Sequence, residues 1–272
     1  MFQLRLGIFC ALCVAILAAR TPAFATSSAE ELKQETRIDE HLNTQLDLDL
    51  PLFDMDGRAA PLRQFIHSGR PVILVPVYYG CPGLCSFTLN GLLTTLNAIE
   101  ERIGLDYTVV TYSINPDEKP PLAKEKSENY YQELKSPEDG RRGWFFLTAD
   151  ESVSKNLSQQ IGFHYKRDGK DYIHASVFVI LTPDGRVSRY FYGINPKARD
   201  VRFALVEASE GRFGTTFDRI LLSCFRWDHL AGRYSFVAWN LVRYTSIAAV
   251  IVLFGLIISL RIRELKRRER SA

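Results

Sequence analysis

The segment that most constrains the fold is PVILVPVYY, residues 71–79. It is a continuous apolar run of strand length, as expected of a strand buried on both faces of a sheet. Pro76 interrupts it, because proline lacks the N–H that a ladder needs, and this predicts a bulge or an early end to pairing. A helical pattern follows, in which apolar residues recur at steps of three and four: Leu89, Leu92, Leu93, Leu96, Ile99 and Ile103.

The alternation of strand and helix continues along the chain. Further strands are predicted at 107–114 and 144–147, and helices at 120–134 and 152–161. An antiparallel hairpin follows, with strands 173–181 and 186–192 around the turn Pro183-Asp184-Gly185, and then helices at 197–210 and 215–223. We therefore expect an α/β domain over residues 51–225, with a central mixed sheet flanked by helices.

The two ends of the chain predict export and anchoring. Residues 1–25 have the features of a signal peptide: Arg5, an apolar stretch from 6 to 19, and the cleavage signature Ala23-Phe24-Ala25. The polar residues 26–50 are interpreted as a linker. No charge occurs between Arg243 and Arg261, so residues 241–260 are predicted to form a transmembrane helix after a juxtamembrane segment, 226–240.

The tail after this apolar segment sets the predicted orientation. Residues 261–272 contain six basic and two acidic residues, which the positive-inside rule places in the cytoplasm. The net charge of residues 26–260 is −3, although the whole chain carries +3. The net positive charge of the chain therefore comes from its two ends and indicates membrane orientation. It does not indicate a nucleic-acid-binding surface.

Three cysteines remain after cleavage of the predicted signal peptide: Cys81, Cys85 and Cys224. Cys81 and Cys85 are spaced to share one helix face, and a helix N-terminus favours their thiolates. A metal site, a redox pair and a structural disulfide are all compatible with this spacing. A second Cys or His pair for zinc is absent, whereas two thiolates and one imidazole would suit Cu(I). Cys224 is expected to be a buried small apolar residue.

A third ligand would have to be one of the histidines. The chain contains His41, His67, His164, His174 and His229. His174 is the favoured candidate, because it opens the predicted hairpin in DYIHASVFVILTPDG at the end of a strand.

Four segments together resemble the SCO/SenC family of copper-binding proteins. They are VYYGCPGLCSFTLNGL, VVTYSINPDEKP, GWFFLTADESVSKNLSQQIGFHY and DYIHASVFVILTPDGRVSRYFYG, in that order. The resemblance implies a thioredoxin-like fold, with Cys81, Cys85 and His174 as copper ligands. The extension with a membrane helix is similar to a bacterial subgroup. The chain departs from many members at Ser86, where proline is frequent, and at Ile173, where an acidic residue is frequent.

The resemblance also implies a function, a partner and a location. The expected function is a membrane-anchored copper metallochaperone that assists assembly of the dinuclear copper centre of cytochrome c oxidase. The expected partner is the copper-bearing oxidase subunit. The alternative is a thiol-disulfide reductase that keeps the cysteines of that centre reduced. The expected location is the bacterial inner membrane, with a single span and the soluble domain in the periplasm.

Overall fold

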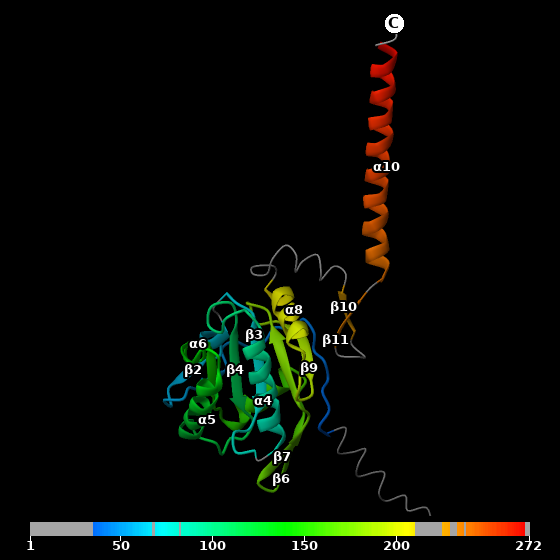
Figure 1. Ribbon diagram of the computed structural model, residues 1–272. Helices are drawn as coiled ribbons and strands as arrows, with labels where there is room; N and C mark the ends of the chain where they lie inside the picture. Colours follow the sequence, from blue (N-terminus) through cyan, green and yellow to red (C-terminus); the bar gives the residue numbers. More distant parts are fainter. Residues whose placement is uncertain are drawn as a thin grey trace, which may run out of the picture.

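Figure 1 presents the computed structural model of the chain. The structure describes residues 35–66, 69–81, 83–209, 225–228, 233–236 and 238–269. Several predictions fall outside these ranges: the signal peptide over 1–25, the first part of the linker, the helix at 215–223, and any role of His67, Cys224 or His229.

The core of the fold is a five-stranded mixed sheet with the order β5-β4-β3-β8-β9. Its strands are β3 (Val72–Val77), β4 (Thr108–Ser113), β5 (Trp144–Leu147), β8 (Val177–Leu181) and β9 (Val187–Tyr192). β3, β4 and β5 are parallel, whereas β8 is antiparallel to both β3 and β9. All residues of β3, β4 and β8 are buried, which explains the almost entirely apolar sequences of β3 and β8, whereas β4 also buries Thr108, Thr111 and Ser113.

Proline is tolerated inside β3 because the strand has different pairing on its two sides. β3 pairs with β4 from Val72 to Val77, but it pairs with β8 only as far as Leu74. Pro76 lies beyond that point, where the side facing β8 no longer requires a ladder donor. The predicted early end to pairing is therefore confirmed, on one side of the strand only.

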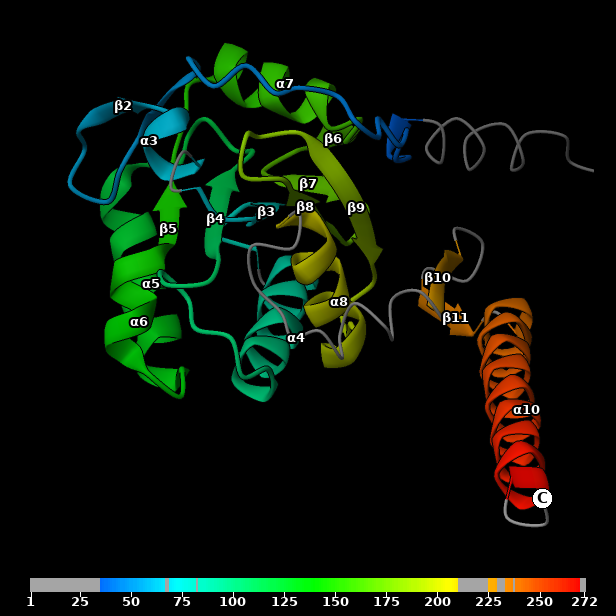
Figure 2. The same cartoon turned by 90° about the horizontal axis from the view of Figure 1, so that it is seen from above.

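Helices cover both faces of the sheet. Figure 2 shows α4 (Leu84–Ala98) and α8 (Ala198–Ala208) on one face, with α3 (Arg63–Ile66) and α7 (Glu151–Gln160) on the other. α5 (Pro120–Glu133) and α6 (Pro137–Gly143) pack together beside β5. The helix α4 ends five residues before the expected Ile103. Ile99 and Ile103 are still buried, which shows that their apolar spacing reflects burial after the helix end.

The predicted strand 173–181 is wrong as a single element. The structure divides it into β7 (Asp171–His174) and β8, which have different partners. β7 pairs with β6 (Tyr165–Asp168) in a separate two-stranded hairpin, whereas β8 pairs with β3 and β9. The break at residues 175 and 176 places His174 at the end of β7, at the same end of the molecule as the start of α4 (Figure 1).

Residues before β1 run along the domain. Ile38 and Gln45 form isolated bridges with Phe163 and Arg186, and Leu46 and Leu50 are buried in the core. β1 (Pro51–Phe53) and β2 (Ala59–Pro61) then form a hairpin around Gly57. The described part of the linker is thus packed against the domain.

The C-terminal part contains a hairpin and one long helix. β10 (Phe225–Asp228) pairs with β11 (Arg233–Phe236), and α10 extends over Ala238–Glu269 (Figure 1). The helix therefore includes most of the basic tail. Among the described residues, no helix combines the length and the hydropathy needed to cross a membrane. The span at 241–260 stays a prediction.

Candidate functional site

The three predicted ligands come from two neighbouring connections. Cys81 lies in the loop between β3 and α4, and Cys85 is the second residue of α4. His174 is the last residue of β7. All three side chains are buried: the exposed fraction is 8% for Cys81, 1% for Cys85 and 9% for His174. Both cysteines are free thiols.

Cys85 and His174 are in direct contact. The Sγ atom of Cys85 lies 2.9 Å from Nε2 of His174, and Nδ1 of His174 lies 2.8 Å from the carbonyl oxygen of Ala175. A carbonyl only accepts, so the hydrogen-bond network assigns the proton to Nδ1. Nε2 then carries the lone pair and can accept the thiol proton of Cys85. The same lone pair is the one that a metal would take.

Cys81 is surrounded by hydrogen-bond donors. Burial is the largest single influence and opposes its thiolate. The N–H of Gly83 donates to the sulfur from 3.4 Å. Hydrogen bonding from the N–H of Cys85 and from the Tyr78 hydroxyl, which also lies 3.4 Å from Oδ1 of Asp171, favours the thiolate further. The Cys85 thiol can direct its single proton to this sulfur as well as to His174, and together these bonds lower the pKa of Cys81 below the ordinary value. The helix face expected to carry both cysteines is not formed, because α4 begins at Leu84 and Cys81 precedes it. The N–H groups of Gly83 and Cys85 at the helix start still favour the Cys81 thiolate.

Cys85 and His174 respond differently to the same surroundings. Burial raises the pKa of Cys85 far above the usual thiol range, despite its place in the first turn of α4. Burial also lowers the pKa of His174, partly offset by the hydrogen bond to Ala175. At neutral pH, Cys85 is thus a thiol and His174 a neutral imidazole, while Cys81 is the more acidic sulfur.

A buried carboxylate holds the loop that carries Cys81. Glu118, in the loop after β4, accepts hydrogen bonds from the N–H groups of Tyr79 at 2.8 Å and Gly80 at 2.7 Å. The Ser113 hydroxyl donates to the same carboxylate at 2.5 Å. These bonds fix the path of the chain as it leaves β3, immediately before Cys81.

Aromatic rings close the site around the histidine. The ring of Phe163 lies 5.7 Å from that of His174, and the ring of Tyr78 lies 6.2 Å from it. Tyr78 also packs on Tyr172 of β7. This wall keeps water from the imidazole on that side and leaves the approach along the start of α4.

The donor set fits a soft monovalent metal, but the free site is not in a metal-binding arrangement. Among the described residues, no group of three or more His, Cys, Asp or Glu side chains is placed to hold a metal ion. Two sulfurs and one imidazole nitrogen nevertheless are the donors that Cu(I) prefers. Cys85 interacts with both Cys81 and His174, so the three donors form a chain.

The other described histidines lie elsewhere. His164 is half-exposed, and its Nε2 is 3.0 Å from Asp39. His41 contacts the carbonyl oxygen of Gln160 at 3.1 Å. Sequence reasoning did not find Tyr78 or Glu118 as site residues. Tyr78 was visible only as the end of an apolar strand, and the bonds of Glu118 reach backbone groups 38 and 39 positions away, which no local pattern records.

Comparison with known families gives a match to most of the domain. A family model described as SCO1/SenC matches residues 43–205. The mixed sheet and its flanking helices have the thioredoxin-like arrangement that the resemblance implied. Among curated proteins, none matches this chain.

Solved structures from Aquifex aeolicus VF5 are similar over 61% of this chain. One, described as a putative electron transfer protein, is 27% identical, is covered over 94% of its length and has a TM-score of 0.55. Another, described as a putative electron transport protein, is 25% identical, is covered over 98% and has a TM-score of 0.51. A copper-bound ScoI from Arabidopsis thaliana, at 20% identity, TM-score 0.47 and coverage of 59% and 96%, is too distant to bear on this site.

Proposed function

The chain belongs to the SCO1/SenC family, and from this premise we propose that it is a copper metallochaperone. Cys81, Cys85 and His174 are its proposed copper ligands. Its proposed task is delivery of copper to the dinuclear copper centre of cytochrome c oxidase. The observation that carries the proposal is the chain of contacts from Cys81 through Cys85 to the Nε2 atom of His174.

The protonation states support uptake of Cu(I). The metal displaces one proton from each thiol, because only thiolates bind it, and the imidazole has to be neutral. The lowered pKa values of Cys81 and of His174 favour one thiolate and the neutral imidazole near neutral pH, whereas the raised pKa of Cys85 means that the metal itself has to displace the proton of that thiol. The charge of the site then changes from zero to −1, so acid, which protonates these donors, should release the metal.

The surface beside the site supports hand-over to a protein. Leu84 and Phe87 lie on the first turns of α4 on either side of Cys85, and the side chain of Phe87 is 58% exposed. An apolar partner surface that covers them would also cover the approach to the sulfurs. The copper-bearing oxidase subunit is the partner proposed for this contact.

Anchoring belongs to the same proposal. We place residues 241–260 across the inner membrane of a bacterium, with the domain in the periplasm. The sequence has no charge between Arg243 and Arg261, and every described side chain of α10 from 243 to 258 is exposed. An apolar helix with no protein cover fits a lipid environment. The signal peptide over 1–25 completes this topology.

Copper content tests the ligand assignment. The full chain, purified in detergent and reduced without oxygen, should retain about one Cu(I) per chain against a competing chelator. Cys81→Ser and Cys85→Ser should abolish retention. His174→Ala should weaken it by at least the roughly 10- to 100-fold that loss of an outer-shell partner costs a metal site. The matched controls His164→Ala and Cys224→Ser should retain copper as the unaltered chain does. Equal retention in the three ligand variants would refute the assignment.

A second candidate, thiol-disulfide reductase, is favoured by the unequal thiols. The Cys81 thiolate would attack a partner disulfide. This attack would form a mixed disulfide between the two proteins and release one partner thiolate. His174 Nε2 would take the proton of Cys85, whose thiolate would then attack Cys81 and release the second partner sulfur. The protons of Cys81 and Cys85 end on the two partner thiols, and two electrons pass to the partner.

The two candidate functions act on different forms of the oxidase copper site: a chaperone gives copper to its dithiol form, and a reductase reduces its disulfide form. Copper-loaded and copper-free reduced protein can each be mixed with the metal-free oxidase copper domain in its dithiol form and in its disulfide form. Transfer of copper from the loaded protein to the dithiol form supports the chaperone. If the loaded protein keeps its copper while the copper-free protein reduces the disulfide form, the reductase candidate is correct.

A further inference from the structure

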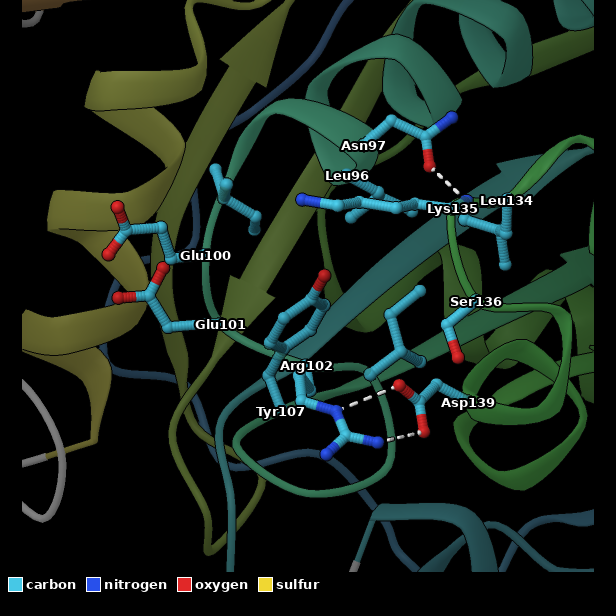
Figure 3. Close-up of a pocket in the computed structure, with 12 residues that line it drawn as sticks. Leu96, Asn97, Glu100, Glu101, Arg102, Tyr107, Leu134, Lys135, Ser136 and Asp139 are labelled. Atoms are coloured by element: carbon cyan, nitrogen blue, oxygen red, sulfur yellow. Dashed lines mark hydrogen bonds and ion pairs between the residues drawn. The ribbon is translucent and has the colours of Figure 1, made fainter.

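A cavity lies far from the cysteines. It has a volume of about 360 Å³ and is lined by the C-terminal end of α4, the following loop and the connection from α5 to α6 (Figure 3). α4 has 15 residues, so its two ends are about 22 Å apart, and this cavity does not share side chains with the copper site. Leu96, Ile99, Ile103 and Leu134 give it apolar walls.

A tyrosine in the lining has an unused hydrogen-bonding group. Tyr107 immediately precedes β4 and is fully buried. Within the part of the chain that the structure describes, its hydroxyl has no hydrogen-bond partner. Figure 3 shows this hydroxyl directed toward the space between the lining side chains, below that of Lys135. A buried hydroxyl without a partner is unfavourable unless something that enters the cavity satisfies it.

One other polar atom of the lining is unpaired among the described residues: Oε2 of Glu101 is also buried without a partner, although Oε1 of the same carboxylate accepts a bond from Arg202 at 2.7 Å. Further polar groups of the lining are occupied. Arg102 makes two bonds of 2.9 Å to Asp139, and Asn97 accepts a bond from the N–H of Lys135 at 2.7 Å. The hydroxyl of Tyr107 is therefore the unpaired donor beneath the cavity. It is covered in the free protein, so a ligand reaches it by displacing the side chain of Lys135, which lies above it in Figure 3.

The charges around Tyr107 restrict the ligand further. Burial raises the pKa of Tyr107, and the carboxylates of Glu101, Asp106 and Asp139 raise it in addition. The hydroxyl thus stays protonated in a negative surrounding that repels anions. Apolar walls with one donor suit a neutral ligand with an apolar body and a single acceptor oxygen.

We propose that this cavity is a binding site for a neutral small molecule that has an apolar body and one carbonyl or ether oxygen, which accepts a hydrogen bond from Tyr107. The site is independent of the copper ligands and of the function proposed for them.

Removal of one hydroxyl tests this inference, and the chain offers a matched control. Tyr112 lies on β4, is equally buried, and bonds through its hydroxyl to that of Ser158 at 2.9 Å. Tyr107→Phe and Tyr112→Phe delete the same atom from neighbouring positions. The full chain is measured in detergent, with thermal unfolding for stability and calorimetry for binding. The probes are acetophenone, which has a carbonyl, and ethylbenzene, which has none.

The proposal predicts opposite behaviour of the two variants. Tyr107→Phe should keep or raise the Tm of the free protein, whereas Tyr112→Phe should lower it. Tyr107→Phe should weaken acetophenone binding by roughly tenfold and leave ethylbenzene binding unchanged, and Tyr112→Phe should change neither.

Three results would overturn the proposal. If Tyr107→Phe lowers the Tm as much as Tyr112→Phe does, the hydroxyl already has a partner in the free protein, such as an ordered water. If acetophenone binds the unaltered chain and the Tyr107→Phe variant equally, the hydroxyl does not recognise the ligand. Absence of acetophenone binding at millimolar concentration would show that the cavity takes no ligand of this class.

Discussion

Glu118 should be the residue on which the loop of Cys81 depends most. Its carboxylate accepts bonds from the N–H groups of Tyr79 and Gly80 and from the Ser113 hydroxyl. In Glu118→Ala, the Tyr79 N–H loses its acceptor inside the core, at about 1–3 kcal/mol. The Ser113 hydroxyl loses a bond to a carboxylate, also at about 1–3 kcal/mol, and as a donor keeps only the longer bond of 3.2 Å to the Asn115 carbonyl oxygen. Gly80 is exposed, so water replaces its partner at little cost. We expect the free energy of unfolding to fall by about 2–6 kcal/mol.

Glu118→Gln provides a graded comparison. The amide keeps the size of the side chain but has only one acceptor oxygen, so a loss of about 1–3 kcal/mol is expected. Glu125 on α5 is exposed, and Glu125→Ala is the control, with a change within about 0.5 kcal/mol.

The assay is chemical denaturation of the full chain, followed through the fluorescence of the buried Trp144. The midpoint should move without a change in slope. A loss below about 1 kcal/mol for Glu118→Ala, or one equal to that of Glu125→Ala, would show that these bonds do not hold the loop.

Three further predictions concern the packing, the thiols and the topology. Gly91→Ala should lower the free energy of unfolding by about 2–4 kcal/mol in chemical denaturation, because a Cβ would meet the Ile194 carbonyl oxygen, whereas Gly255→Ala, with open space around it, should not. When the reduced protein is labelled with iodoacetamide and examined by mass spectrometry, Cys81 should react before Cys85 and at a lower pH. The reason is that the pKa of Cys81 is lowered and that of Cys85 is raised. Faster labelling of Cys85 would contradict this order. A C-terminal fusion to a reporter that is active only outside the cytoplasm should give no signal, and a strong signal would reverse the proposed topology.

Much of the sheet was predictable because buried strands have a recognisable residue composition. The strands at 107–114 and 144–147 are β4 and β5 to within a residue, since both segments are rich in the β-branched and aromatic residues that strands favour. The turn Pro183-Asp184-Gly185 also lies where expected, because a tight hairpin needs the positive φ that Gly185 adopts.

The errors occur where pairing, and not burial, decides the structure. IHASVFVIL reads as one strand, yet its first part pairs with β6 and its second part with β3 and β9. In β6, YKRD, only Tyr165 is half-buried, and the three charged residues after it are exposed, so their extended conformation depends on their partner strand. A single sequence contains no record of that partner.

The residues proposed as ligands could be named from the sequence, whereas the residues that support them could not. Cys81 and Cys85 are marked by their spacing, and His174 by its place at a strand end and by the family resemblance. Tyr78 and Glu118 have ordinary sequence neighbourhoods. Their roles arise from contacts with Cys81 and with the backbone of Tyr79 and Gly80, which exist only after β3 and β4 have paired.

The most direct test of the proposed copper site is X-ray absorption spectroscopy of the full chain loaded with one Cu(I). The account predicts two sulfur ligands and one nitrogen ligand. In His174→Ala, the nitrogen should be lost while both sulfurs remain, and in Cys85→Ser one sulfur should be lost. A nitrogen ligand that persists in His174→Ala, or a copper without sulfur ligands, would contradict the assignment of Cys81, Cys85 and His174.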